Sequence, residues 1–136
     1  MADTLERFIN YLENLRDKDW KAMVNSKWDV KDVVSHLVGW EEECAKALIN
    51  SLKTGETPWF LENEDYDEFN KQSVEKYKNY SPKKLLEKWK YFIRMWEKEI
   101  RKVSNKDKSK LKPVYDSDSH YIEHWEQIKK VLNKSG

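Results

Sequence analysis

Residues 28–48, WDVKDVVSHLVGWEEECAKAL, contain the pattern that decides the fold. Apolar residues recur along this stretch at intervals of three and four, which is the period of an amphipathic α-helix. Asp29 is expected to be the N-cap, and Asp32 places negative charge in the first turn, where it is favourable. Gly55 is expected to end the helix. The sequence therefore predicts a helix over about residues 29–53.

Three further stretches show the same periodicity. They are predicted to form helices at residues 3–16, at residues 82–103 and from about residues 116–119 to just before residue 136. Ser81 and Pro82 are a typical helix start, an N-cap followed by proline at the first helical position. Four amphipathic helices bury their apolar stripes against one another. The expected fold is all-α, a four-helix bundle in a single domain over residues 1–136.

The connections between these helices are predicted from polar and proline-containing segments. Residues 56–80 are expected to form a long loop around Pro58, followed by a short helix, between the second and third long helices. Residues 104–110, SNKDKSK, are expected to be a loop. A short linker with Trp20 and Met23 is expected before the second long helix.

The composition argues against several classes of protein. The chain has 26 Lys and Arg against 25 Asp and Glu, and the two signs are interspersed, so no basic stripe suggests a nucleic-acid partner. No uncharged apolar run is long enough to span a membrane, and no secretory signal is visible at the N-terminus. The single cysteine, Cys44, excludes an internal disulfide framework. A cytoplasmic protein that binds neither nucleic acid nor membrane is expected.

The three histidines are the candidate metal ligands. His120 and His124 are four residues apart on the last predicted helix, so both imidazoles can reach one point. His36 lies one turn before Trp40 on the apolar side of the second long helix. Three neutral imidazoles suit a divalent ion, with zinc or nickel expected, and leave coordination positions open for water or substrate.

Two structural alternatives compete with the metal site. A histidine on an apolar face is usually a packed residue whose ring nitrogens are satisfied by hydrogen bonds. In this alternative the three rings are core residues that bind no metal. Cys44 lies two turns after His36, which suggests a nucleophile or a fourth ligand, but a buried inert thiol is the simpler interpretation.

Three segments resemble the DinB/YfiT-like proteins. Trp28–Glu41, WDVKDVVSHLVGWE, is similar to the signature that opens their second helix. Asp67–Asn70, DEFN, resembles their acidic-aromatic segment before the third long helix, and Ser119–His124, SHYIEH, resembles their final pair of histidines. The pairing of His120 with Tyr121 is similar to that of the ClbS/DfsB-like branch.

This resemblance implies an up-down-down-up bundle that binds a divalent metal through His36, His120 and His124, often as a homodimer. It also implies a metal-dependent enzyme, a hydrolase or thiol S-transferase, that acts on a small electrophilic molecule. The alternative is a non-catalytic bundle of the same fold that binds a metal or ligand or serves in dimerisation.

Other residues are weaker candidates for the same site. Asp116, one turn before His120, is the candidate general acid or base, or else a helix cap. Glu41 and Glu123 are candidates for orienting the imidazoles. Asn70 is expected either to contact substrate or to cap a helix. The residues expected to line the pocket, or else to pack in the core or lid, are Trp40, Trp59, Phe60 and Tyr121.

Overall fold

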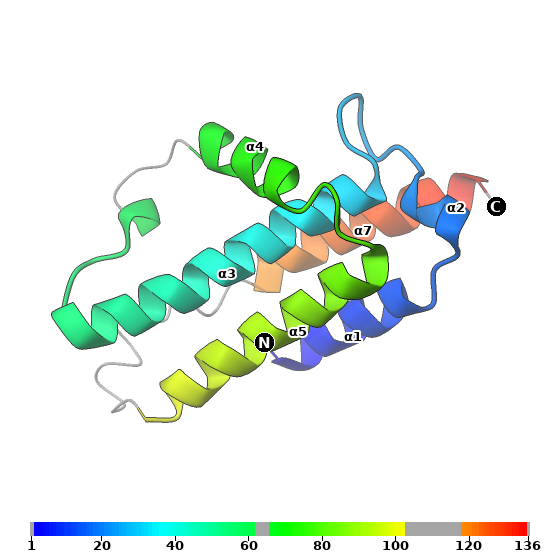
Figure 1. The fold of residues 1–136 in the computed structure, drawn as a ribbon. Helices are drawn as coiled ribbons and strands as arrows, with labels where there is room; N and C mark the ends of the chain where they lie inside the picture. Colours follow the sequence, from blue (N-terminus) through cyan, green and yellow to red (C-terminus); the bar gives the residue numbers. More distant parts are fainter. Residues whose placement is uncertain (1, 62–65, 103–117, 136) are drawn as a thin grey trace.

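The computed structural model describes residues 2–61, 66–102 and 118–135 and is all-helical in that part of the chain (Figure 1). The α-helices are α1 (Ala2–Glu13), α2 (Asp17–Trp20), α3 (Val30–Thr54), α4 (Asp67–Lys76), α5 (Pro82–Ile100) and α7 (Asp118–Ser135). A short 3₁₀-helix, η1 (Trp59–Leu61), lies between α3 and α4. The predicted all-α fold class is confirmed.

The longest helix, α3, is the element around which the others pack. It has its most extensive contacts with α5 and α4, and it also contacts α2 and α7. Helix α1 packs against α5 and α7. Figure 1 shows the long helices α1, α3, α5 and α7 running alongside one another, with α4 lying across α3. Their apolar side chains form one buried cluster, which includes Phe8, Leu37, Leu48, Trp89 and Ile128.

The ends of α3 and α5 follow from the capping residues that the sequence predicts. The Asp29 carboxylate accepts a hydrogen bond from the backbone N–H of Asp32 at 2.8 Å, and the Asp32 carboxylate accepts one from the backbone N–H of Asp29 at 3.1 Å. Gly55 ends α3 in the left-handed region at φ 77°, which glycine adopts without steric cost. Ser81 caps α5, and Pro82 is its first residue. These three signals are confirmed.

The structure differs from the predicted elements near the N-terminus. Helix α1 ends at Glu13 instead of residue 16, and the predicted linker contains the one-turn helix α2. Arg16 and Asp19 hold this turn together, because the Asp19 carboxylate accepts from the backbone N–H of Arg16 at 2.9 Å. Trp20 at its end is buried in the core. A single turn is too short to show helical periodicity in the sequence.

Helix α4 lies very close to α3 at Gly39. A Cβ atom built on Gly39 would lie 2.2 Å from Oγ and 2.4 Å from Cβ of Ser73, which is buried on α4. The absence of a side chain at Gly39 therefore allows this approach. Lys76 and Tyr77 add polar contacts to the same pair of helices, because both donate to the Glu42 carboxylate, at 2.6 and 3.0 Å.

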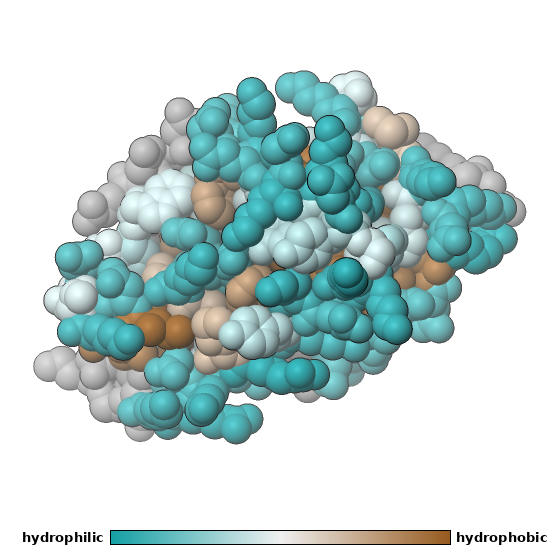
Figure 2. Space-filling model, viewed as in Figure 1, coloured by the Kyte–Doolittle hydropathy of each residue, from teal (hydrophilic) through white to brown (hydrophobic). Residues whose placement is uncertain are grey.

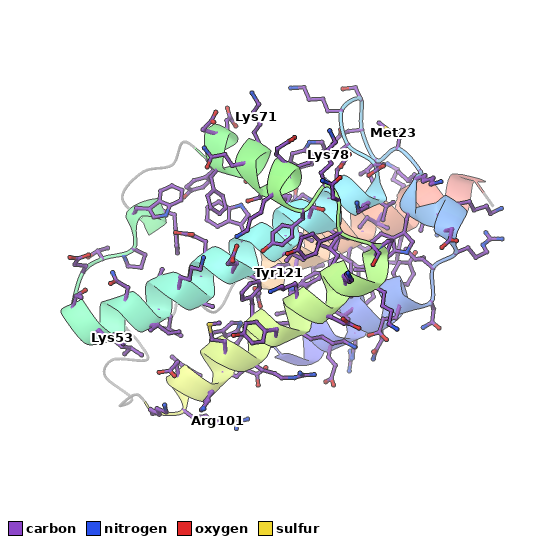
Figure 3. The ribbon with its side chains drawn as sticks, in the orientation of Figure 1. Met23, Lys53, Lys71, Lys78, Arg101 and Tyr121 are labelled. Atoms are coloured by element: carbon purple, nitrogen blue, oxygen red, sulfur yellow. The ribbon has the colours of Figure 1, made fainter. Side chains whose placement is uncertain are left out.

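A buried carboxylate, Glu41, connects α3 to two other helices. Its side chain is only 2% exposed. The indole N–H of Trp96 on α5 donates to Oε1 at 2.9 Å, and the hydroxyl of Tyr121 on α7 donates to Oε2 at 2.5 Å. Tyr121 lies at the centre of the bundle beside α3 (Figure 3). One carboxyl group thus links the three helices, and a buried carboxyl group requires such donors.

The visible surface is mostly hydrophilic (Figure 2). The large apolar side chains that remain exposed come from different elements: Met23, Leu52, Trp59, Tyr91 and Ile122. Among the described helices, none has the length and apolar character required to cross a membrane.

The contact between Gly39 and Ser73 predicts the effect of adding one methyl group. Gly39→Ala should destabilise the protein by about 1–3 kcal/mol, because α4 has to move away, although alanine is the better helix former. Urea unfolding measures the change. Combining it with Ser73→Gly removes the opposing Cβ and should restore part of the loss. A Gly39→Ala variant as stable as the wild type would contradict this close approach.

The environment of Glu41 predicts how stability depends on pH. Burial raises the pKa of Glu41 from 4.5 to about 7, despite the hydrogen bonds from Tyr121 and Trp96 that favour its charged form. Between pH 4.5 and about 7, Glu41 therefore keeps its proton in the folded protein, whereas in the unfolded chain it has lost it. This stabilisation is complete below pH 4.5 and is lost as pH rises through about 7.

Glu41→Gln should remove this contribution. The unfolding free energy of the wild type relative to the variant should fall by on the order of 3 kcal/mol between pH 4.5 and 8, measured by urea unfolding at each pH. Glu42→Gln is the matched control. Burial of Glu42 raises its pKa, but the hydrogen bonds from Lys76 and Tyr77 outweigh this effect, so its pKa is lowered overall. The stability that Glu42 contributes is lost only as pH falls. The unfolding free energy of the wild type relative to Glu42→Gln should therefore not change between pH 6 and 8. If the unfolding free energy of the wild type relative to Glu41→Gln did not change over this pH range, the raised pKa of Glu41 would be refuted.

Candidate functional site

His36 and His124 are brought together from opposite ends of the sequence. His36 lies on α3 and is only 4% exposed. His124 lies on α7, and the centroids of the two imidazole rings are 5.3 Å apart at an interplanar angle of 74°. The Trp28 ring also contacts His36, with 5.2 Å between ring centroids. Two of the predicted ligands therefore face each other at the interface between α3 and α7.

The surroundings of His124 favour a neutral imidazole. Nδ1 of His124 lies 3.1 Å from Oε1 of Gln127, three residues later on the same helix. Donation of the Nδ1 proton to this oxygen directs the lone pair to Nε2, the arrangement found in most metal-binding histidines. Burial lowers the pKa of His124, while the Gln127 hydrogen bond and the charge of Glu123 act in the opposite direction. A neutral ring is the form that binds metals.

His120, the third predicted ligand, lies in α7 one turn before His124. Its side chain, like Asp116, lies outside the described part of the structure. Among the side chains that are described, no three potential metal ligands lie together. The three-histidine site and the role of Asp116 therefore stay predictions.

The spacing of His36 and His124 fits a shared metal ion. Two imidazoles bound to one tetrahedral ion at about 2.1 Å have ring centroids roughly 5 Å apart. The observed separation of 5.3 Å agrees with this value, and it also lies in the ordinary range for two rings packed edge to face. Both side chains come from long helices, which hold a site more accurately than loops do. The residues present therefore fit a metal site at this interface.

Three of the four predicted pocket residues lie in one aromatic cluster. Trp40 on α3 contacts Trp59 and Phe60 of η1, with ring centroids 6.0 and 5.5 Å away. Tyr66 and Phe69 complete the cluster, because each of them contacts both Trp40 and Trp59. The fourth residue, Tyr121, instead contacts Trp89 and Glu41. The rings of the cluster pack on one another, which agrees with the alternative that these residues pack in the core or lid.

Asn70 supports this aromatic cluster. Its side-chain oxygen accepts a hydrogen bond from the indole N–H of Trp40 at 2.8 Å. The N-cap of α4 is Tyr66, so Asn70 does not cap that helix. A second indole, that of Trp59, donates to the Glu43 carboxylate at 2.8 Å. The polar atoms around Trp40 and Trp59 therefore hold the connection between α3 and α4 in place.

Two further candidates on α3 have environments that define their chemistry. The donors to Glu41 among the described side chains are Trp96 and Tyr121 rather than an imidazole, so its expected role of orienting a histidine directly is not what this geometry provides. Burial raises the pKa of the Cys44 thiol, and the charges of Glu41 and Glu43 raise it further. A thiol in this environment is a poor nucleophile, which agrees with the interpretation of Cys44 as inert.

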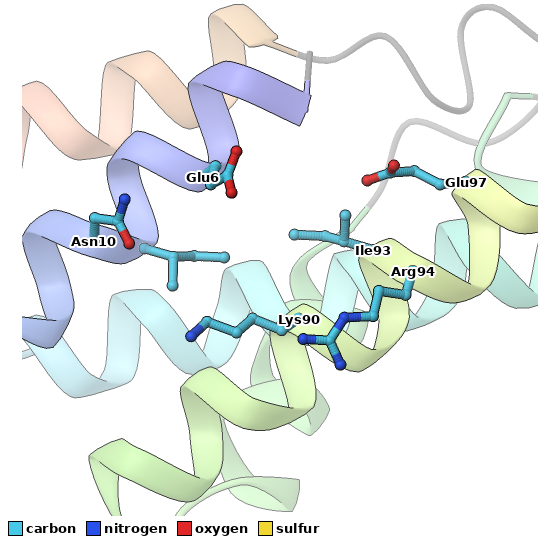
Figure 4. Close-up of a pocket in the computed structure, with 7 residues that line it drawn as sticks. Glu6, Asn10, Lys90, Ile93, Arg94 and Glu97 are labelled. Carbon is cyan, nitrogen blue, oxygen red and sulfur yellow. The ribbon is translucent and has the colours of Figure 1, made fainter.

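A separate cavity of about 350 Å³ lies between α1 and α5. Figure 4 shows Glu6 and Asn10 on α1 facing Lys90, Arg94 and Glu97 on α5. Neither His36 nor His124 lines it. Because its charged residues carry both signs, the cavity does not select an anion or a cation.

Two residues near the histidines were not predicted from the sequence. Gln127 could have been found from its spacing, because residues three apart on a helix are neighbours. The contact of Trp28 with His36 joins the residue before the N-cap to the second turn of α3. Its place in the signature Trp28–Glu41 was the available signal.

A comparison with known protein families shows to which family the chain belongs. The family model described as mycothiol maleylpyruvate isomerase N-terminal domain matches residues 1–121. No curated protein matches the chain significantly. No solved structure matches it significantly either. The matched residues include the signature around His36 and reach the first turn of α7. The chain therefore belongs to the mycothiol maleylpyruvate isomerase N-terminal domain family, which has the DinB/YfiT-like superfamily fold.

Proposed function

We propose that this protein is a metal-dependent enzyme that uses a small thiol to attack an electrophilic substrate. The observation that carries the proposal is the contact between the imidazoles of His36 and His124, 5.3 Å apart on two long helices. The description of the family, which names an isomerase and the thiol mycothiol, favours a thiol over water as the nucleophile. A hydrolase is the second form of the same proposal, with water in place of the thiol.

His36, His120 and His124 would hold the metal, with zinc or nickel expected. His120 joins the set because α7 carries it one turn before His124. A divalent ion held by three imidazoles supplies a nucleophile at neutral pH, since it stabilises the conjugate base of a thiol or of water. Gln127 keeps the His124 ring in the tautomer that presents Nε2.

The same proposal includes the topology of the bundle. The chain direction of the long helices in Figure 1 supports the up-down-down-up arrangement, with α3 and α5 running opposite to α1 and α7. A single domain over residues 1–136, a homodimer, a cytoplasmic location and the ClbS/DfsB-like branch remain predictions.

The metal is tested by comparing the wild type with single alanine variants. We expect near-stoichiometric zinc or nickel in protein purified without a histidine-rich tag and measured by elemental mass spectrometry. His36→Ala, His120→Ala and His124→Ala should each reduce metal content at least about tenfold, because two imidazoles bind a divalent ion far more weakly than three. Glu126→Ala, an exposed change on α7, is the matched control and should keep its metal.

The outcomes separate the competing functions. A wild-type protein that takes up none of zinc, nickel or manganese would refute the metalloenzyme and leave packed histidines. Metal without turnover of electrophiles, either with thiols or in water, would favour the non-catalytic binding module. Turnover that requires a thiol and is lost in the histidine variants is the expected result.

A further inference from the structure

The Glu41 carboxylate is hydrogen-bonded by the helix that carries two of the three histidines. Tyr121 on α7 donates to Oε2, and Trp96 on α5 donates to Oε1. Helix α7 contains His120 and His124, whereas α5 contains no histidine. The two hydrogen bonds therefore connect the same carboxyl group to one helix with candidate metal ligands and to one without.

Two contacts set the position of α7 on α3. One is the ring contact of His36 with His124, and the other is the hydrogen bond of Glu41 with Tyr121. From the first contact to the second, the residue number rises on α3 and falls on α7, so the helices are antiparallel. The contacts are about 7.5 Å apart along α3 and about 4.5 Å apart along α7. Two contacts at different heights restrict both the rotation and the translation of one helix on the other.

The Tyr121 and His124 side chains move together when α7 rotates. Residues three apart on a helix project from the same side, about 60° apart around its axis. A rotation of α7 that moves the Tyr121 hydroxyl relative to Glu41 therefore also moves the His124 ring relative to His36. The hydroxyl has to stay near Glu41, because a buried carboxylate that loses a donor is costly.

We propose that Glu41 is a positioning residue for the imidazoles of α7, acting through the Tyr121 hydroxyl. Its hydrogen-bond donors among the described side chains are Tyr121 and Trp96, neither of which is a histidine. Its bond to Tyr121 selects the one rotation of α7 in which the His124 ring faces His36. The proposal rests on the proposed function only in the statement that these imidazoles bind a metal, and the geometry of the rings can be measured without one.

The two donors to Glu41 give a test with an internal control. Tyr121→Phe removes the hydroxyl that links Glu41 to α7 and keeps the ring in the core. Trp96→Phe removes the link to α5 and also leaves a gap where the larger indole was, so it is the more disruptive change. If Glu41 were only a satisfied core residue, the control would disturb the protein at least as much as the test variant.

The first readout is the contact between the histidine rings in metal-free protein. In protein with labelled histidine, we expect NMR cross-relaxation between the His36 and His124 ring protons in the wild type and in Trp96→Phe, and at least a twofold loss in Tyr121→Phe. The second readout is zinc affinity, which should fall about tenfold in Tyr121→Phe and stay within twofold in Trp96→Phe, as expected when a residue that orients metal ligands is changed.

Failure of this proposal can be told from failure of the proposed function. An unchanged ring contact in Tyr121→Phe, or an equal loss in Trp96→Phe, would overturn the positioning role even if the wild type binds zinc. A wild type that binds none of zinc, nickel or manganese would refute the metal site, yet the ring contact in the two variants would still decide whether Glu41 positions α7.

Discussion

Burial of a carboxyl group at Glu41 is the constraint on which the arrangement of the helices depends. A carboxylate removed from water has to be met by donors, and here both described donors come from other helices, Trp96 on α5 and Tyr121 on α7. Apolar packing alone tolerates small rotations of one helix on another, whereas hydrogen bonds restrict them. The carboxylate therefore joins α3, α5 and α7 by hydrogen bonds at one point in the core.

The candidate site uses the helix pair that this carboxylate holds. His36 and His124 meet where α3 and α7 contact each other, and neither residue depends on a loop for its position. The aromatic cluster around Trp40 lies further along α3 and is held through Asn70 and α4. Helix α3 thus carries three side chains with different roles: the imidazole of His36, the ring of Trp40 in the aromatic cluster, and the buried carboxylate of Glu41.

Local signals in the sequence were sufficient to predict the long helices. Asp29, Gly55 and Ser81 act on their immediate neighbours, so the ends of α3 and the start of α5 could be predicted. The inward side of His36 and the pairing of His120 with His124 followed from helical spacing, while their assignment to one metal ion gained further support from the resemblance. The partners of Glu41 lie 55 and 80 residues away, and the contact of Gly39 with Ser73 also joins separate helices. No spacing rule reaches such pairs, because they depend on how the helices pack.

The environment of Cys44 bears on the chemistry proposed for this protein. A protein that brings thiols and electrophiles together exposes its own cysteines to alkylation, and thiolates react far faster than thiols. The one cysteine of this chain packs against the core, and burial beside Glu41 and Glu43 raises its pKa. The protein therefore has no readily ionised sulfur of its own that would compete with a small thiol for an electrophile.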